Sequence, residues 1–261
     1  MIPQMLLVNA DNIDFMIHGI FSYEIFGQTV WITTSHVCVL IVVISILIFF
    51  FAAGQVFKHA KEIPGPIQCA LEAAVEFLDG ITEGAMGEKG KGFKNYIGTL
   101  FIFILFSNIS GLLGLRPPTA DYGVTLPLGL LTFSLVRINE LKYNDLWSIW
   151  KDKCSPLPPW LPIWLPINII GDVAVPISLS LRLFANVLSG TVMMALLYGL
   201  LSKIAIGWPA ALHVYFDLFS GAIQTYVFCM LTVTYIGSAI GDNDESVFKR
   251  MFKKKKEQTQ A

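Results

Sequence analysis

One charged side chain lies inside a long apolar stretch of this sequence. Arg182 is in the middle of ISLSLRLFANVLSGTVMMALLYGLL. Placing an arginine at the centre of a membrane helix costs roughly 2.5–3.5 kcal/mol on insertion scales, and its guanidinium stays protonated there. Arg182 could therefore bind an anionic group at membrane depth. Alternatively, a fixed acidic partner could hold it and keep two helices in register.

Polar side chains form a stripe on each of the last two apolar blocks. Positions four before, four after and seven after Arg182 share one helix face, and they hold Ser178, Asn186 and Ser189. The last block carries a stripe with similar helical spacing, made of Asp217, Ser220, Gly221 and Gln224. Such stripes can form hydrogen bonds between helices. They can also line two aqueous routes that converge on a fixed positive charge.

Asp172 is a further acid on the block that carries Arg182. A helical rise of about 1.5 Å per residue places it about 15 Å before Arg182 along the axis. We predict that Asp172 and Asp217 line one aqueous route on the external side of Arg182. No pattern indicates a catalytic, metal or cofactor site, because the four cysteines lack metal-ligand spacing and GAMGEKGKG lacks the spacing of a phosphate-binding loop.

The composition indicates a membrane protein. Hydrophobic residues make up 54% of the 261 positions, charged residues make up 14%, and the mean hydropathy is +0.63. Soluble domains contain about 25% charged residues, so this chain could not cover a water-facing surface, which excludes a soluble enzyme. The formal net charge of −1 argues against a nucleic-acid partner, which would require a basic face. The partner that the composition indicates is the lipid bilayer.

Five apolar segments are predicted to cross the membrane as helices. They cover residues 30–57, 96–115, 122–136, 160–201 and 204–240. The last two are roughly 40 residues each, or about 60 Å as straight helices, whereas the hydrocarbon core is about 30 Å thick. Because neither contains a strong loop signal, we expect two long, strongly tilted helices rather than two broken pairs.

Residues 66–85 are predicted to form an amphipathic helix on the membrane surface. Their apolar residues recur at intervals of three and four, and the acids lie on the other face. The glycine-rich GAMGEKGKG that follows is expected to be a flexible linker. The predicted fold class is thus an all-α integral membrane protein with about five transmembrane helices, one amphipathic surface helix and a single membrane domain. The parts of that domain are an external segment 1–29, the first span 30–57, the surface helix 66–85, a helical pair 96–136, a long tilted pair 160–240 and a basic tail 241–261.

The distribution of lysine and arginine indicates the orientation of the chain. Residues 1–57 contain neither, whereas basic residues flank the amphipathic helix, follow the third span and occur throughout the tail. Because cytoplasmic flanks are enriched in these residues, we expect an external N-terminal segment, five crossings and a cytoplasmic tail. Only Arg116 and Lys203 then lie in external connections.

Three segments resemble one known family. SLSLRLFANVLSG resembles the arginine-bearing segment of subunit a of F-type ATP synthases, also called ATP synthase subunit 6. LFIFILFSNISGLLGL and PPTADYGVTLPLGLLTF are similar to the paired spans of that family, including the Pro-Thr-x-Asp connection at residues 118–121. GAIQTYVFCMLTVTYIGSA is similar to its last helix, with Gln224 at the matching glutamine. The resemblance covers most of residues 60–240.

The resemblance implies a non-catalytic stator subunit of the Fo sector of a rotary ATP synthase. Such a subunit forms two half-channels against the rotating c-ring and couples the translocation of H⁺ or Na⁺ to ATP synthesis. It implies that Arg182 faces the ring carboxylates, with Asn186 and Gln224 beside it. Asp217 stands where the family holds a titratable group, whereas Thr191 replaces a common glutamate. The implied partners are the c-ring and the peripheral-stalk subunit b.

Two rival interpretations are weaker. A secondary transporter or ion channel could use Arg182 to bind an anionic substrate, but the sequence shows no internal repeat of the kind many transporters carry. A membrane scaffold would leave Arg182 unexplained. The basic tail and the length favour the plasma membrane of a bacterium over a mitochondrial inner membrane.

Overall fold

The computed structural model describes most of the chain as helix. The described residues are 19–25, 28–59, 65–113, 115–144, 164–200 and 214–240, together with the single positions 149 and 212. Predictions for residues 1–18, Lys203 and the tail 241–261 lie outside the described residues. The elements are β1 (Gly19–Ile25), β2 (Gln28–Thr33), α2 (Thr34–Lys58), α3 (Pro66–Met86), η1 (Gly87–Gly92), α4 (Lys94–Ile109), η2 (Ser110–Leu113), η3 (Pro118–Ala120), α5 (Tyr122–Tyr143), α7 (Trp164–Leu200), η4 (Val214–Ser220) and α9 (Gly221–Ile240).

Five described helical segments are long and apolar enough to cross a membrane, as the sequence predicted. They are Thr34–Lys58, Lys94–Leu113, Tyr122–Tyr143, Ile167–Leu197 and Val214–Ile240. The expected all-α membrane fold is therefore confirmed. The third helix is seven residues longer than predicted, because α5 continues past residue 136 to Tyr143. The fourth block forms one continuous helix, α7, rather than a broken pair.

The start of the first span differs from the prediction. Residues 28–33 form β2, which pairs antiparallel with β1 from Ile25↔Gln28 to Gly19↔Thr33, and the helix begins only at Thr34. QTVWIT contains four β-branched residues in its last five positions that favour a strand. Hydropathy alone does not separate such a strand from the first turn of an apolar helix. The membrane fold therefore has a two-stranded hairpin before its first spanning helix.

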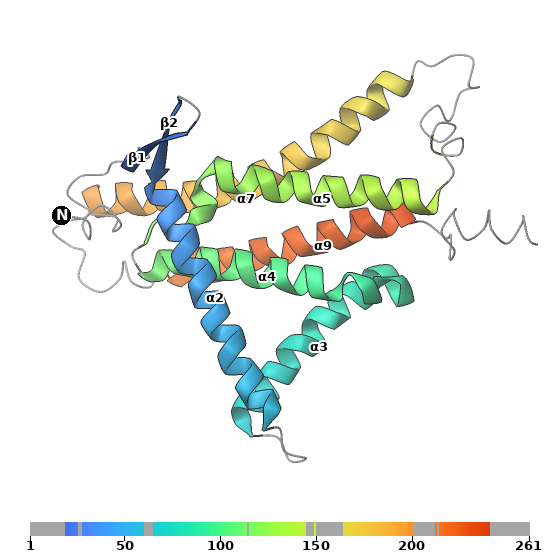
Figure 1. Ribbon diagram of the computed structural model, residues 1–261, viewed down its shortest axis with the longest axis horizontal. Helices are drawn as coiled ribbons and strands as arrows, with labels where there is room; N and C mark the ends of the chain where they lie inside the picture. Colours follow the sequence, from blue (N-terminus) through green and yellow to red (C-terminus); the bar gives the residue numbers. More distant parts are fainter. Residues whose placement is uncertain are drawn as a thin grey trace, which may run out of the picture.

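Four helices run alongside one another and form the core. Figure 1 shows α4, α5, α7 and α9 lying lengthwise together, whereas α2 crosses them steeply and α3 returns to them, so that α2 and α3 form a V. The side chains that pack between the four helices are fully buried, and they include Ile97, Ile104, Leu183, Phe228 and Ile236. This packing fixes α7 and α9 against each other through α4 and α5.

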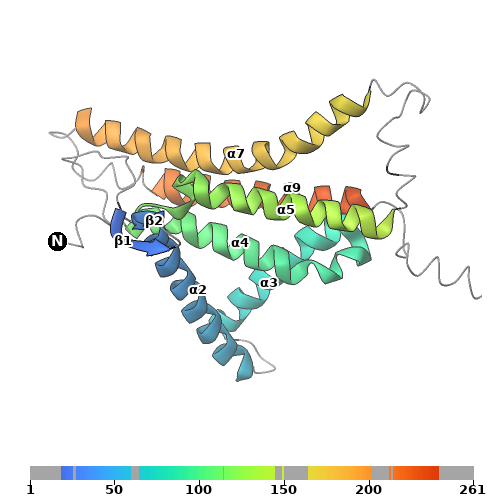
Figure 2. The same ribbon diagram turned by 45° about the horizontal axis from the view of Figure 1, so that its top comes forward.

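Helix α7 is too long to stand upright in a bilayer. Its 37 residues would extend about 55 Å as a straight helix, against a hydrocarbon thickness of about 30 Å. Figure 2 shows that α7 is curved, with its N-terminal part bending away from α5. Pro176 lies inside the helix, and a proline removes one backbone hydrogen bond and favours such a bend. A strong tilt of α7 in the membrane remains our prediction.

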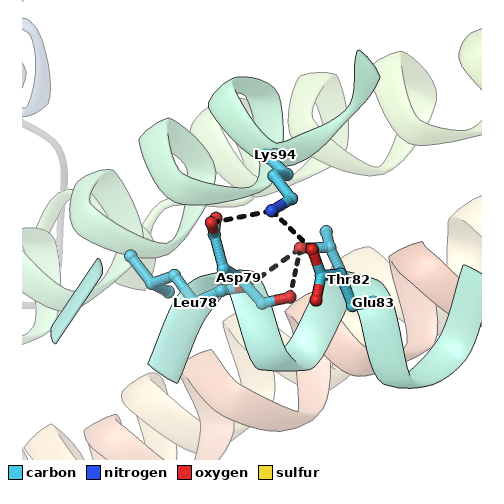
Figure 3. A network of polar contacts seen from close by, with 5 residues as sticks. All are labelled: Leu78, Asp79, Thr82, Glu83 and Lys94. Carbon is cyan, nitrogen blue, oxygen red and sulfur yellow. Dashed lines mark hydrogen bonds and ion pairs between the residues drawn. The ribbon is translucent and has the colours of Figure 1, made fainter. Parts of the chain in front are cut away.

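An ion-pair cluster fastens α3 to the start of α4. The Lys94 ammonium lies 2.7 Å from an Asp79 carboxylate oxygen and 2.8 Å from a Glu83 carboxylate oxygen, as Figure 3 shows. The hydroxyl of Thr82 donates to the backbone carbonyls of Leu78 and Asp79 on the same helix (Figure 3). Two acids of the predicted amphipathic helix therefore form ion pairs with a lysine of the same chain.

The predicted glycine-rich linker is a helical turn in the structure. α3 extends to Met86, and Gly87–Gly92 form the 3-10 helix η1. Gly87 has a φ of 58°, in the left-handed region that glycine adopts most readily. A Cβ on Gly90 would lie 2.9 Å from the carbonyl oxygen of Thr82, so only glycine permits this close turn. The glycine-rich composition could not distinguish this turn from a flexible linker, because the contacts that define the turn depend on the fold.

The orientation of the chain can be tested by labelling from each side of the membrane. We expect single cysteines at Asn12 and Thr259, in a chain without its own cysteines, to react with impermeant thiol reagents from opposite faces. The expectation follows from five crossings, which place the two ends on different sides. Labelling of both cysteines from the same face would contradict the five-crossing arrangement. Labelling after the membranes are opened by detergent is the control for accessibility.

Candidate functional site

Arg182 lies on the uncovered face of α7. Its neighbours Leu179 and Leu183 are 2% and 0% exposed and face the core, and the helical turn therefore directs Arg182 outward. Arg182 forms no hydrogen bond or ion pair with the residues that the structure describes. The described part of the chain thus lends no support to the interpretation in which a fixed acid pins this arginine.

A continuous strip of exposed side chains surrounds Arg182. Its members share the helix face at intervals of three and four residues, and they are Ile177, Ser178, Leu181, Ala185, Asn186 and Ser189. No helix within the described residues covers this face. Small and polar side chains on either side of the arginine leave its guanidinium accessible to another macromolecule.

Asn186 connects the arginine helix to the last helix. Its Nδ2 donates to the Oε1 of Gln224 at 2.7 Å. Asn186 is exposed, whereas Gln224 is only 4% exposed, so the pair runs from the uncovered face into the protein. The Nε2 of Gln224 is buried and has no hydrogen-bond partner among the residues that the structure describes. Because an unpaired buried donor costs about 1–3 kcal/mol, a water molecule is expected at this position.

A narrow cleft adjoins Gln224. The space that the centre of a water molecule can occupy in it is ≈ 20 Å³, enough for one or two waters. Its lining combines polar side chains from α4, α7, η4 and α9 with small residues, and includes Asn108, Pro117, Asn186, Gly190, Asp217, Ser220, Gly221 and Gln224. The cleft therefore gathers the predicted Asn186, Gln224 and Asp217 in one place.

Asp217 reaches the cleft from the π-helix η4, directly before α9. A π-turn contains an extra residue compared with an α-turn and occurs often at functional sites, because it redirects side chains. The Asp217 carboxylate packs against Gly111, where an added Cβ would lie 3.2 Å from both Cγ and Oδ2 of the aspartate. Gly111 therefore leaves the space that the carboxylate occupies.

Asn108 belongs to this site, although the sequence reasoning did not select it. Its Nδ2 donates to the Gly221 carbonyl at 3.1 Å and to the Thr225 hydroxyl at 3.3 Å. Its Oδ1 accepts from the Thr119 hydroxyl at 2.9 Å. One buried amide thus joins α4, η3 and α9 beside the cleft. The available signal was a lone amide inside the apolar run LFIFILFSNISGLLGL.

The structure places Asp172 and Asp217, which were predicted to line the same route, in different parts of the helix bundle. Asp172 pairs with Arg137 near the end of α5, and its Oδ1 lies 3.1 Å from the Nη2 of Arg137. Asp217 lies against Gly111 and shares the cleft with Pro117, just before the start of α5. The two acids are therefore at opposite ends of the helix bundle. The reason is that Asp172 is on the N-terminal part of α7, beside the end of α5, whereas η4 follows α7 in the chain and lies beside η2 (Ser110–Leu113), which precedes α5. Figure 1 shows α7 and α5 lying lengthwise together.

Comparison with known proteins identifies a family that matches most of this chain. The family described as ATP synthase A chain matches residues 36–237 of the sequence.

The chain belongs to this family.

Proteins similar to this chain come from several bacteria. One is the ATP synthase subunit a, sodium ion specific, of Propionigenium modestum, 36% identical over 71% of this chain and 67% of the relative. A second is the ATP synthase subunit a of Sulfurihydrogenibium sp. (strain YO3AOP1), 32% identical over 77% of this chain and 92% of the relative. A third is that of Neorickettsia sennetsu, 29% identical over 83% of this chain and 92% of the relative. The resemblance found in the sequence is confirmed.

Proposed function

We propose that this chain is the membrane stator subunit of the Fo sector of a rotary ATP synthase, and that it carries H⁺ or Na⁺ to and from a rotor ring. The observation that carries the proposal is the position of Arg182. A permanent cation lies on an uncovered face of a membrane-spanning helix, without an ionic partner among the described residues. Family membership and the similarity to bacterial subunits a, one of them sodium-specific, support it.

The charge on Arg182 can hold and release a carboxylate of the ring. An ion pair about 4 Å apart gains about 4 kcal/mol at an effective dielectric constant near 20. A membrane potential supplies about 2.3 kcal/mol per charge per 100 mV. The two energies are comparable, so the driving force can separate a hydrated pair. The exposure of Arg182 and the polar residues beside it provide the necessary hydration.

The cleft around Gln224 provides a route for the ion toward the ring. Asp217 would accept the ion from the external solution, and Asn186 would lie nearest to the uncovered face. Oxygen and amide groups can relay a proton through water or coordinate Na⁺ in passing. The buried Nε2 of Gln224, which donates to none of the described residues, favours a water molecule between these groups.

Two partners belong to this proposal. The c-ring binds the uncovered face of α7, and a peripheral-stalk subunit b holds the stator against rotation. ATP is made by other subunits, and this chain supplies no catalytic group. It is a multi-pass protein of a bacterial plasma membrane, as its bacterial relatives and five candidate spans support.

Purification of the complex from membranes tests this function. The chain should co-purify with a ring of small hairpin proteins and a peripheral ATPase. After reconstitution into liposomes, ATP hydrolysis should drive quenching of a pH-sensitive dye for H⁺, or accumulation of radioactive Na⁺. A chain that purifies alone and transports an anion would instead be a transporter, and the proposal would be wrong.

Asp217→Asn is expected to reduce ion-driven ATP synthesis by at least about tenfold, because the variant loses its titratable or ion-coordinating carboxylate. The asparagine has almost the same size, so the contact with Gly111 and the assembly of the complex should persist. ATP synthesis in inverted membrane vesicles over a broad pH range measures the effect. Glu76→Gln, an exposed acid on α3, is the control and should leave the rate unchanged. An unchanged rate in Asp217→Asn would remove Asp217 from the ion route.

A further inference from the structure

Arg137 forms a cluster of charges between α5 and α7. Its Nη2 lies 3.1 Å from Oδ1 of Asp172, and its Nη1 lies 3.3 Å from Oδ2 of the same carboxylate. Nη1 also donates to Glu140, three residues later on α5. The Phe133 ring lies 5.3 Å from the guanidinium carbon. The two-pronged contact with Asp172 fixes both the distance and the orientation of the arginine.

The cluster is partly shielded from solvent. The side chains of Arg137, Asp172 and Glu140 are 29%, 27% and 19% exposed, and Nε of Arg137 is buried without a partner. Ion pairs with such limited exposure are screened less than surface pairs. Removing one member leaves charges that solvent cannot fully neutralise, which costs more than the loss of a surface pair.

A second contact between α5 and α7 lies farther toward Arg182. A Cβ on Gly129 would be 2.7 Å from the carbonyl oxygen of Pro176, so the two backbones touch there. Pro176 lies one helical turn after Asp172, and Arg182 lies less than two turns after Pro176. The ion pair and the backbone contact therefore hold α7 at two points, both on the N-terminal side of Arg182.

Two fixed points determine both the separation and the direction of one helix relative to another. After Pro176, where the helix already bends, Leu179 and Leu183 pack in the core, whereas before it Asp172 provides the charged contact to α5. A change of the angle at this bend would displace the guanidinium of Arg182 from its position opposite a ring carboxylate. The Arg137–Asp172 contact opposes this motion at the other side of the bend.

We propose that Arg137 and Asp172 are positioning residues that fix α7 against α5 and so set the place of Arg182. The inference rests on the proposed function and deepens it, because it assigns Asp172 a role in geometry rather than in ion transfer. Asp172 and Glu140 together neutralise Arg137, so the cluster adds no net positive charge beside Arg182.

The proposal predicts a particular pattern in a double-mutant cycle. Arg137→Gln leaves Asp172 and Glu140 without their shared cation, and Asp172→Asn removes the charged tie to α7. Each should lower ATP synthesis in membrane vesicles by about fivefold, in line with coupling energies between contacting residues. Arg137→Gln combined with Asp172→Asn restores the net charge of the cluster and allows an amide–amide hydrogen bond. The double variant should recover to within about twofold of the parent protein.

The pH profile distinguishes positioning from ion transfer. If the pair positions α7, Asp172→Asn lowers the rate at every pH without changing the shape of the profile. Immunoblots of the membranes and the ATPase rate of the purified complex give the amount of assembled enzyme, to which each rate is normalised. Lys142→Gln removes an exposed cation from the same helix and should leave the rate unchanged.

Two results would overturn the proposal. A double variant that is as impaired as Asp172→Asn, with an altered pH profile, would show that Asp172 itself handles the ion. Normal synthesis in both single variants would show that α7 does not need this contact. Neither result would affect the stator function, because that function depends on Arg182, whose substitution is tested separately.

Discussion

Arg182→Ala is expected to abolish ATP synthesis and ATP-driven ion pumping, while the complex still assembles. In the proposed mechanism, the guanidinium keeps each arriving ring carboxylate ionised, so the ion must leave before that site passes. In the same mechanism, it prevents an ion from moving directly between the two half-channels. Without the charge both effects disappear, and passive ion leak should persist or rise. ATP synthesis, ATP-driven dye quenching and leak are measured in the same vesicles, together with the amount of assembled complex.

Arg182→Lys separates charge from geometry at the same position. Lysine keeps a cation but lacks the planar fork of the guanidinium, and it can lose its proton in an apolar site. We therefore expect it to fail in synthesis as well. If Arg182 had only a structural role, Arg182→Ala would lower the amount of protein in the membrane. An assembled Arg182→Ala complex that still makes ATP would refute the role of Arg182 as the stator charge.

Gly129→Leu is expected to prevent assembly of the subunit. A Cβ at this position would lie 2.7 Å from the Pro176 carbonyl oxygen and 3.2 Å from the Ser180 Cβ. The first neighbour is backbone and cannot rotate away, so α5 and α7 must separate. Even modest overpacking costs about 1–3 kcal/mol, and a leucine adds three further carbons. Immunoblots of membranes should show loss of the subunit, and Gly129→Ala should show a partial loss.

Gly54→Leu is the matched control for this substitution. Gly54 lies in the spanning helix α2, and a Cβ there would meet nothing within 4 Å. The same change of residue should therefore leave the amount of subunit in the membrane almost unchanged. If Gly129→Leu assembled as well as Gly54→Leu and made ATP at the normal rate, the close approach of α5 and α7 would not be required for either property.

The sequence located the membrane helices and the central charge, because both depend on local composition. A run of apolar residues is long enough to cross a bilayer whatever its neighbours are, and a lone arginine within it is unusual in any fold. The grouping of Asn186 and Gln224 was also predictable, through the family resemblance. Their hydrogen bond at 2.7 Å is consistent with that expectation.

Other features of the site depended on contacts between distant parts of the chain. Asn108 donates to Gly221, 113 residues later, and Arg137 pairs with Asp172, 35 residues later. Helical periodicity shows on which face of its helix a side chain lies, but not which other helix packs against that face. Sequence reasoning therefore placed Asp172 in a channel, whereas the structure shows it held by an arginine on another helix.

By itself, the sequence determined that this protein is built from membrane-spanning helices around an embedded arginine. The cost of placing charge in hydrocarbon makes that conclusion independent of the helix arrangement. Only the tertiary structure decided that Asp217 and Asp172 lie at opposite ends of the bundle. It also decided that a π-turn brings Asp217 into the cleft and that Gly129 brings α5 against α7. These results depend on side-chain packing between helices, which requires all of the partners to be in place at once.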